Sequence, residues 1–201
     1  MFDNTEKYKI YKFNNLKEYY EAQVAKNIRK LQSVWVEEQE IYLISKHISL
    51  NIPNVNFGIC HGVRNGKEVE WFKKYLEIDN IMGTDISPTA LDFKDVIQWD
   101  FNNAKPEWYQ NVDFIYSNSY DHSHSPQVCL DVWMKCLKPK GICYIHWSKS
   151  NEIQFDSADC FAASEDFYRR SFNVNYKVIN EINYKKRIIF AIKHGDNHDC
   201  L

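Results

Sequence analysis

The sequence contains no apolar run long enough to cross a bilayer, no cysteines with Cys-x-x-Cys spacing and no stripe of basic residues. Its longest apolar runs, such as Ile142–Trp147, fall far short of the ~20 residues that a membrane-spanning helix needs. Lysine and arginine are scattered over a chain with a net charge of −2, which disfavours nucleic acid as a partner. The polar N-terminus shows no signal peptide. We therefore expect a cytoplasmic protein without a nucleic-acid or membrane partner.

Cysteine is present, but its spacing is not that of a zinc site. The six cysteines fit reduced thiols that pack in a core: Cys60, Cys129, Cys136, Cys143, Cys160 and Cys200. Linkers rich in glycine or serine are also absent, and 201 residues are enough for one α/β domain with a buried core.

The first quarter of the chain has a helical pattern from Leu16 to about Ile48. Apolar residues recur there at three and four positions and predict one buried stripe: Tyr20, Val24, Ile28, Leu31 and Trp35. Pro53 ends the segment. Because no linker follows, we expect residues 1–50 to form an N-terminal helical cap on a main domain that spans residues 51–201.

From Val55 onward, short apolar runs alternate with helix-like stretches, which predicts a parallel sheet with crossover helices. The expected strands are Val55–Ile59, Ile81–Asp85, Val96–Asp100, Val112–Ser117 and Ile142–Trp147.

Two connections between these strands are distinctive. Pro126–Leu137 has proline in its first turn and an apolar face, as a helix would. Only about ten residues separate Asp85 from Val96, so a single turn or an irregular segment is expected there.

The C-terminal part predicts a helix at Phe161–Arg170 and then two β-rich runs. These runs, Val174–Ile179 and Arg187–Ile192, are joined by a seven-residue polar connection and are expected to form an antiparallel hairpin.

Gly58, Gly62 and Gly66 follow the first strand, where a doubly wound sheet brings its backbone close to a ligand. Alone they are weak evidence, because glycines also serve simple turns. Asp85 ends the second strand, where such sheets place a carboxylate that accepts hydrogen bonds from ribose hydroxyls. The alternative role for Asp85 is an N-cap of a short helix.

The chain from about Asn54 to His194 resembles the class I S-adenosylmethionine-dependent methyltransferases. Gly58–Gly66 resembles their first motif, although its glycines are four residues apart, and Asp85 matches the acidic residue after their second strand. Gln98–Phe101 resembles their third motif, which implies that Asp100 holds the adenine amino group and that Phe101 packs on the ring. The resemblance also places Ile86, and Ser117 at the end of the fourth strand, in the cofactor site.

This resemblance implies an α/β fold of the Rossmann-like type, with a seven-stranded, mostly parallel sheet and an antiparallel C-terminal hairpin. It implies S-adenosylmethionine as the cofactor. A nicotinamide-dependent oxidoreductase ranks second, because the first turn lacks Gly-x-Gly-x-x-Gly spacing. A methyltransferase of protein or RNA and a non-catalytic cofactor-binding domain are further alternatives.

Methyl transfer from a sulfonium is an in-line displacement, so proximity and orientation can supply much of its acceleration. A hydroxyl acceptor must also lose its proton, and Asp121 or His122, which follow the fourth strand, could act as the base. The alternative for His122 and His124 is a solvated loop. A metal site made from Asp121, His122 and His124 is disfavoured, because residues so close in one loop seldom converge.

His146 ends the fifth strand and is expected to face the substrate, with a core histidine as the alternative. His124 is assigned to the substrate side as well. His61 and Arg64 are candidates for contact with the cofactor carboxylate, and simple loop structure is the alternative for His61. Together these features predict transfer of a methyl group to a small polar acceptor, such as a hydroxyl of a sugar or another metabolite.

Overall fold

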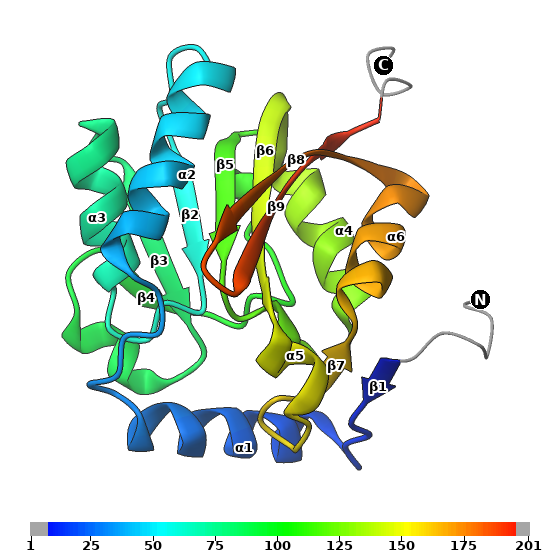
Figure 1. The fold of residues 1–201 in the computed structure, drawn as a ribbon. Coiled ribbons are helices and arrows are strands. Elements are labelled where there is room, and N and C mark those ends of the chain that lie inside the picture. Colours follow the sequence, from blue (N-terminus) through cyan, green and yellow to red (C-terminus); the bar gives the residue numbers. More distant parts are fainter. Residues whose placement is uncertain (1–7, 196–201) are drawn as a thin grey trace.

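Residues 8–195, which the computed structural model describes, are organised around a mixed seven-stranded sheet (Figure 1). The strand order is β4-β3-β2-β5-β6-β9-β8. Strands β4 to β6 are parallel, whereas β9 is antiparallel to both of its neighbours. The strands are β2 (Gly58–His61), β3 (Ile81–Asp85), β4 (Val96–Gln98), β5 (Val112–Ser117), β6 (Leu137–Ser148), β8 (Tyr176–Tyr184) and β9 (Arg187–His194). The predicted fold class is confirmed.

Successive side chains of the central strands point to opposite faces of the sheet and build two core layers. In β5, Ile115 packs with helices α4 (Pro126–Cys136) and α6 (Glu165–Asn175). Its neighbour Phe114 packs with α2 (Glu38–Asn51) and α3 (Lys67–Leu76) on the other face. The central strands are buried on both faces, which explains their continuous apolar runs.

The N-terminal segment differs from the prediction. It forms two helices, α1 (Leu16–Arg29) and α2, and the residues of the predicted stripe are largely exposed: Tyr20 by 36%, Ile28 by 51% and Trp35 by 54%. The buried residues of α1 are instead mainly polar, namely Tyr19, Gln23, Lys26 and Asn27. The stripe was wrong because α1 crosses the carboxyl edge of the sheet (Figure 1), where its neighbours are polar side chains.

Helix α2 has a different environment from α1. Its residues Ile41, Ile44 and Ile48 are fully buried against the sheet. Only α1 therefore lies over the sheet edge as a cap would. The predicted division of the chain into residues 1–50 and residues 51–201 stays a prediction.

Several boundaries are also corrected. The connection after Asp85 is the short 3₁₀ helix η1 (Pro88–Asp92), as expected. Phe161–Ala163, predicted as helix, is strand β7 and pairs with β1 (Tyr8–Ile10), so α6 begins only at Glu165. The hairpin is antiparallel as predicted, but its strands are longer and only two residues connect them. The remaining short elements are η2 (Pro106–Trp108), η3 (Tyr120–His122) and α5 (Lys149–Ile153).

None of the helices within residues 8–195 is long and apolar enough to cross a membrane. The five cysteines in this range are buried free thiols, in agreement with the expected core role, and Cys200 lies outside the described residues.

A substitution at Gly58 tests the close approach of β2 to β5. A Cβ there would lie 2.2 Å from Cε1 of Phe114, so the buried ring would have to move. We expect Gly58→Ala to lower the free energy of unfolding by about 1–3 kcal/mol, measured by urea denaturation. Gly195→Ala, where a Cβ would meet nothing within 4 Å, is the matched control and should change it by less than about 0.5 kcal/mol. Equal effects of the two variants would contradict this packing.

Candidate functional site

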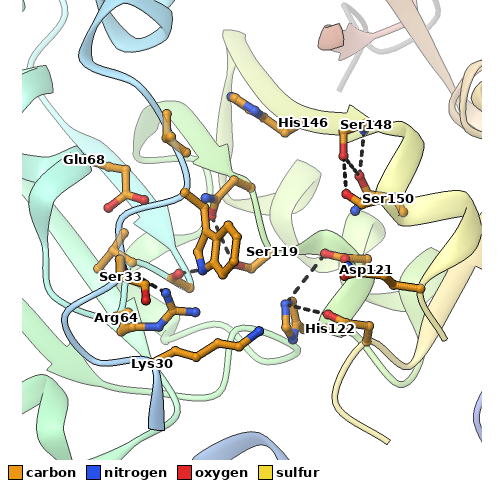
Figure 2. Close-up of a pocket in the computed structure, with 18 of the residues that line it drawn as sticks. Lys30, Ser33, Arg64, Glu68, Ser119, Asp121, His122, His146, Ser148 and Ser150 are labelled. Atoms are coloured by element: carbon orange, nitrogen blue, oxygen red, sulfur yellow. Dashed lines mark hydrogen bonds and ion pairs between the residues drawn. The ribbon is translucent and has the colours of Figure 1, made fainter. Parts of the chain in front are cut away.

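Two adjoining cavities lie at the carboxyl edge of the parallel strands. The larger, of about 310 Å³, is shown in Figure 2 and is called the main cavity below. The smaller, of about 40 Å³, lies between α1 and the ends of β3 and β4 and is called the small cavity. Four residues line both cavities, which makes them parts of one groove: Gly62, Arg64, Ser119 and His122.

Of the three candidate glycines, only Gly62 lines this groove. It has a φ of 74°, and an added Cβ would lie 2.6 Å from Cβ of Ser119, so glycine lets the ends of β2 and β5 approach each other. Gly66 is the N-cap of α3. Gly58 begins β2 and therefore lies at the amino end of the strand, away from the loop to which the sequence assigned it.

Asp85 lies at the end of β3 and binds three donors of its own chain. Oδ1 accepts from Nδ2 of Asn27 (2.8 Å) and from the backbone N–H of Ser87 (2.9 Å), while Oδ2 accepts from the backbone N–H of Arg64 (2.9 Å). Burial raises the pKa of this carboxyl, and the hydrogen bonds oppose the rise. A carboxylate has about four acceptor positions, so one remains for a ligand. Its neighbour Ile86 also lines the small cavity.

Asp100 and Phe101 line the same cavity. Oδ1 of Asp100 accepts from the backbone N–H (2.9 Å) and the Nδ2 (2.7 Å) of Asn102, and Oδ2 accepts from the hydroxyl of Tyr20 (2.8 Å). Burial, together with Asp100, raises the pKa of Tyr20 to about 12. Helix α1 therefore covers the two carboxylates that the sequence assigned to the cofactor.

His61 and Ser117 point away from both cavities. The imidazole of His61 stacks on Trp133 with ring centroids 4.9 Å apart, and its Nδ1 lies 2.8 Å from Oγ1 of Thr84. Burial lowers the pKa of His61 to about 3. The Ser117 hydroxyl donates to the backbone oxygen of His61 (3.0 Å). Neither side chain lines either cavity in this structure, and their assignment to cofactor contacts stays a prediction.

Arg64 lies on the wall of the groove, as expected for a ligand contact. Its Nη1 donates to the backbone oxygen of Ser33 (3.1 Å), while its buried Nε has no hydrogen-bond partner among the described residues. Burial lowers the pKa of the guanidinium, and Asp85 and Glu68 oppose this effect.

His146 and His124 occupy different places. His146 lines the main cavity but is only 7% exposed. Its Nε2 lies 3.2 Å from the hydroxyl of Tyr116, and its Nδ1 lies 3.7 Å from Oε1 of Glu40. Burial lowers its pKa to about 3, so the ring is neutral. His124 packs against Tyr19 and lines a separate cavity of about 180 Å³, which places it outside the main cavity.

Asp121 and His122, the candidate acid–base residues, lie together on η3 and line the main cavity. Nε2 of His122 is 3.9 Å from Oδ1 of Asp121 and 3.5 Å from Oδ1 of Asp159 (Figure 2). Burial raises the pKa of Asp121. We call these three residues the carboxylate–imidazole cluster.

Asp159 was not among the predicted site residues; it follows α5 in an irregular loop and pairs with the ammonium of Lys26. Lys26 was also missed. The recurrence of polar residues at Gln23, Lys26 and Asn27 is the one pattern that could have shown that this face of α1 is buried against polar groups.

Glu68 of α3 was missed as well. It is 5% exposed, lines the main cavity, and its Oε2 has no hydrogen-bond partner among the described residues. Burial raises its pKa to about 7.

Comparisons with known proteins were made by sequence and by structure. Neither a protein-family model nor a curated protein matches the sequence. The structure is similar to Burkholderia thailandensis 1,6-didemethyltoxoflavin-N1-methyltransferase with bound 1,6-didemethyltoxoflavin and S-adenosylhomocysteine, with a TM-score of 0.70, 11% identity and 98% of each chain covered.

Two further solved structures are similar over most of the chain. The N-methyltransferase NodS from Bradyrhizobium japonicum WM9, in complex with S-adenosylhomocysteine, has a TM-score of 0.64 and 13% identity, with 87% of this chain and 100% of that chain covered. A TehB-like S-adenosylmethionine-dependent methyltransferase from Corynebacterium glutamicum has a TM-score of 0.55 and 14% identity, with 90% and 100% covered.

The raised pKa of Glu68 predicts a pH dependence of stability. The carboxyl has a reference pKa of 4.5 and a folded-state pKa of about 7, so between these values the folded state binds more protons and is destabilised as the pH rises. From pH 4 to pH 8, we expect the unfolding free energy of the wild type to fall by up to about 3 kcal/mol more than that of Glu68→Gln. Urea denaturation at several pH values measures this. Glu70→Gln, at an exposed position of the same helix, is the control, and parallel pH profiles of wild type and Glu68→Gln would refute the prediction.

The sheet order, the antiparallel β9 and the likeness to these structures lead to one conclusion: the chain has the Rossmann-like fold of class I S-adenosylmethionine-dependent methyltransferases.

Proposed function

We propose that the protein transfers a methyl group from S-adenosylmethionine to a small polar acceptor, such as a hydroxyl of a sugar or another metabolite. The observation that carries this proposal is the groove at the carboxyl edge, where Gly62, Asp85 and Asp100 lie at the carboxyl ends of β2, β3 and β4 in the order of the family's cofactor motifs. Two of the similar structures contain S-adenosylhomocysteine, the demethylated cofactor.

The residues of the groove fit this cofactor. Gly62 leaves the space that a Cβ would fill, and Arg64 has a buried Nε without a hydrogen-bond partner among the described residues. In this proposal Gly62 and Arg64 hold the methionine part, Asp85 and Ile86 the ribose, and Asp100 and Phe101 the adenine. The bound cofactor supplies an electrophilic methyl group on a positively charged sulfur.

Helix α1 must move when the cofactor binds. The small cavity of about 40 Å³, where the adenosine part is proposed to bind, has room for a few water molecules, whereas ligand pockets have volumes of roughly 300–1,000 Å³. The side chains of α1 that fill this space bind the same carboxylates through polar groups, Asn27 to Asp85 and Tyr20 to Asp100. Hydroxyl and amino groups of the cofactor can replace these donors.

The cofactor assignment predicts opposite effects for two substitutions. Asp85→Ala should weaken binding of S-adenosylhomocysteine more than tenfold, because a hydrogen bond to an ionised group contributes about 1.5–3 kcal/mol. Tyr20→Phe removes a competing donor to Asp100 and should leave the affinity unchanged or increase it. Isothermal titration calorimetry measures both, with NADH as the comparison ligand. Binding of NADH in place of S-adenosylhomocysteine would favour the oxidoreductase alternative, and unchanged affinity in Asp85→Ala would remove Asp85 from the site.

On the acceptor side, we propose that Asp121 and His122 take the proton from the acceptor's nucleophilic group. His122 lines both cavities, so it lies between the proposed cofactor and the space of the main cavity. The hydrogen bond of its Nδ1 to Oε1 of Gln23 orients the ring (3.1 Å). A neutral imidazole oriented in this way can act as a general base.

Substitution of this pair should separate turnover from cofactor binding. With an acceptor that supports turnover, His122→Asn and Asp121→Asn should each lower kcat by roughly 10²–10⁴-fold, the usual contribution of acid–base catalysis. Affinity for S-adenosylhomocysteine should change less than twofold. Full activity in both variants would show that proximity and orientation suffice without a general base. Loss of cofactor binding would show that Asp121 and His122 have a structural role.

A further inference from the structure

The tautomer of His122 is fixed by a neighbouring amide. The orientation of the Gln23 amide is defined by its nitrogen Nε2, which donates to the backbone oxygens of Ser157 (3.3 Å) and Ala158 (2.9 Å). Its Oε1, which can only accept, is therefore the atom that contacts Nδ1 of His122 (3.1 Å). Nδ1 carries the hydrogen, and Nε2 of neutral His122 presents a lone pair.

That lone pair faces two carboxylate oxygens. Nε2 of His122, one oxygen of Asp121 and one oxygen of Asp159 all lie within 4.8 Å of one another (Figure 2). The distances of 3.5 and 3.9 Å from Nε2 exceed the roughly 2.7–2.9 Å of a charge-assisted hydrogen bond. Three acceptors that converge in this way repel one another unless a donor or a cation lies between them.

A second observation on the same cavity also indicates a polar ligand. Oε2 of Glu68 and Nε of Arg64 are buried without a hydrogen-bond partner among residues 8–195, and both residues line the main cavity. Glu68 is 5% exposed. Buried polar groups are nearly always satisfied, so these atoms indicate that the cavity binds polar groups.

The charge of the cluster matches a monovalent cation. Asp121, Asp159 and Asp156 supply three carboxylates, and Lys26, which pairs with both Asp159 and Asp156, supplies with Lys30 two ammonium groups. A single positive charge neutralises the remainder. A divalent ion would leave excess positive charge beside Lys26 and Lys30, which line the same cavity.

The spacing of the three acceptors is compatible with N–H donors. Hydrogen bonds of about 2.9 Å to one nitrogen place their acceptors about 4–5 Å apart, and ligand bonds of about 2.1 Å around an octahedral ion such as Mg²⁺ place neighbouring ligand atoms about 3 Å apart. The separations of 3.5 and 3.9 Å from Nε2 lie between these two arrangements, and the two carboxylate oxygens are no more than 4.8 Å apart. The charge balance, and not the spacing, therefore favours an ammonium over a divalent ion.

We propose that the carboxylate–imidazole cluster receives a primary ammonium group, so that the methyl acceptor is an amine; this rests on the methyltransferase function proposed above. His122 Nε2 accepts one proton of the ammonium, and Asp121 and Asp159 hold the other two N–H groups. The freed lone pair forms the new N–C bond as the C–S bond of the cofactor breaks and its electron pair leaves with the sulfur. The products are a methylated ammonium and S-adenosylhomocysteine, and the imidazolium returns its proton to solvent.

The test uses the full chain saturated with S-adenosylhomocysteine and ethylammonium chloride as the probe. The ring nitrogens of His122 are followed by NMR and assigned with His122→Asn. We expect ethylammonium to shift the Nε2 resonance saturably, whereas tetramethylammonium, which has the charge but no N–H, and ethanol should not. Asp121→Asn should weaken this response at least tenfold. Asp92→Asn, the same change at an exposed position that lines neither cavity, should leave it within twofold.

Each other outcome overturns the inference. Absence of a saturable shift with ethylammonium would show that the cluster is an internal ion pair of a protonated His122. Tighter binding of Mn²⁺ or Mg²⁺ than of ethylammonium at the imidazole of His122 would show that the carboxylate–imidazole cluster is a metal site. An equal shift of the His122 Nε2 resonance with ethanol would indicate that the methyl acceptor is a hydroxyl group. Failure of S-adenosylhomocysteine to bind at all, seen beforehand by calorimetry, would refute the proposed function instead, so the two failures are distinguishable.

Discussion

The hydrogen bonds of the Asp85 carboxylate hold the carboxyl edge of this fold together. One side chain joins the end of β3, the loop after β2 and helix α1, through Ser87, Arg64 and Asn27. Burial disfavours the charge of Asp85, and these three donors compensate part of that cost. Because the backbone N–H of Arg64 belongs to the turn that Gly62 begins, the position of this turn depends on the same carboxylate. The groove is therefore shaped by a residue that is also proposed to bind the ligand.

The sheet could be predicted from the sequence because its central strands are buried on both faces. Ile81–Asp85 and Val112–Ser117 were predicted with the observed bounds, since a strand covered on both sides must be apolar throughout. Strand β7 could not be predicted, because its pairing with β1 joins segments about 150 residues apart. Helix α1 was placed with the wrong face inward, because a periodicity rule assumes an apolar neighbour and α1 covers polar groups.

The candidate site was predictable to the extent that it follows from topology. Gly62, Asp85, Asp100 and Asp121 line the groove because each follows a parallel strand at its carboxyl end. His61 is at an equivalent place, yet its ring points to the core layer that contains Trp133, because the last residue of a strand can point to either side of the sheet. Asp159 could not have been found, because its loop is brought to His122 only by the packing of β7 and α1.

Helix α1 connects the cofactor and acceptor sides of the groove. Its Asn27 binds Asp85, its Gln23 orients His122, and its Lys26 neutralises Asp159. These three contacts lie on one face of one helix, so under the proposed function a displacement of α1 that admits the cofactor would also change the support of the carboxylate–imidazole cluster. Such a coupling is reciprocal: occupancy of the cofactor side would bias the position of α1, and so would occupancy of the cluster. A helix with a polar buried face is suited to this role, because its hydrogen bonds can be exchanged with those of a ligand, whereas an apolar interface would have to be exposed to water before the helix could move.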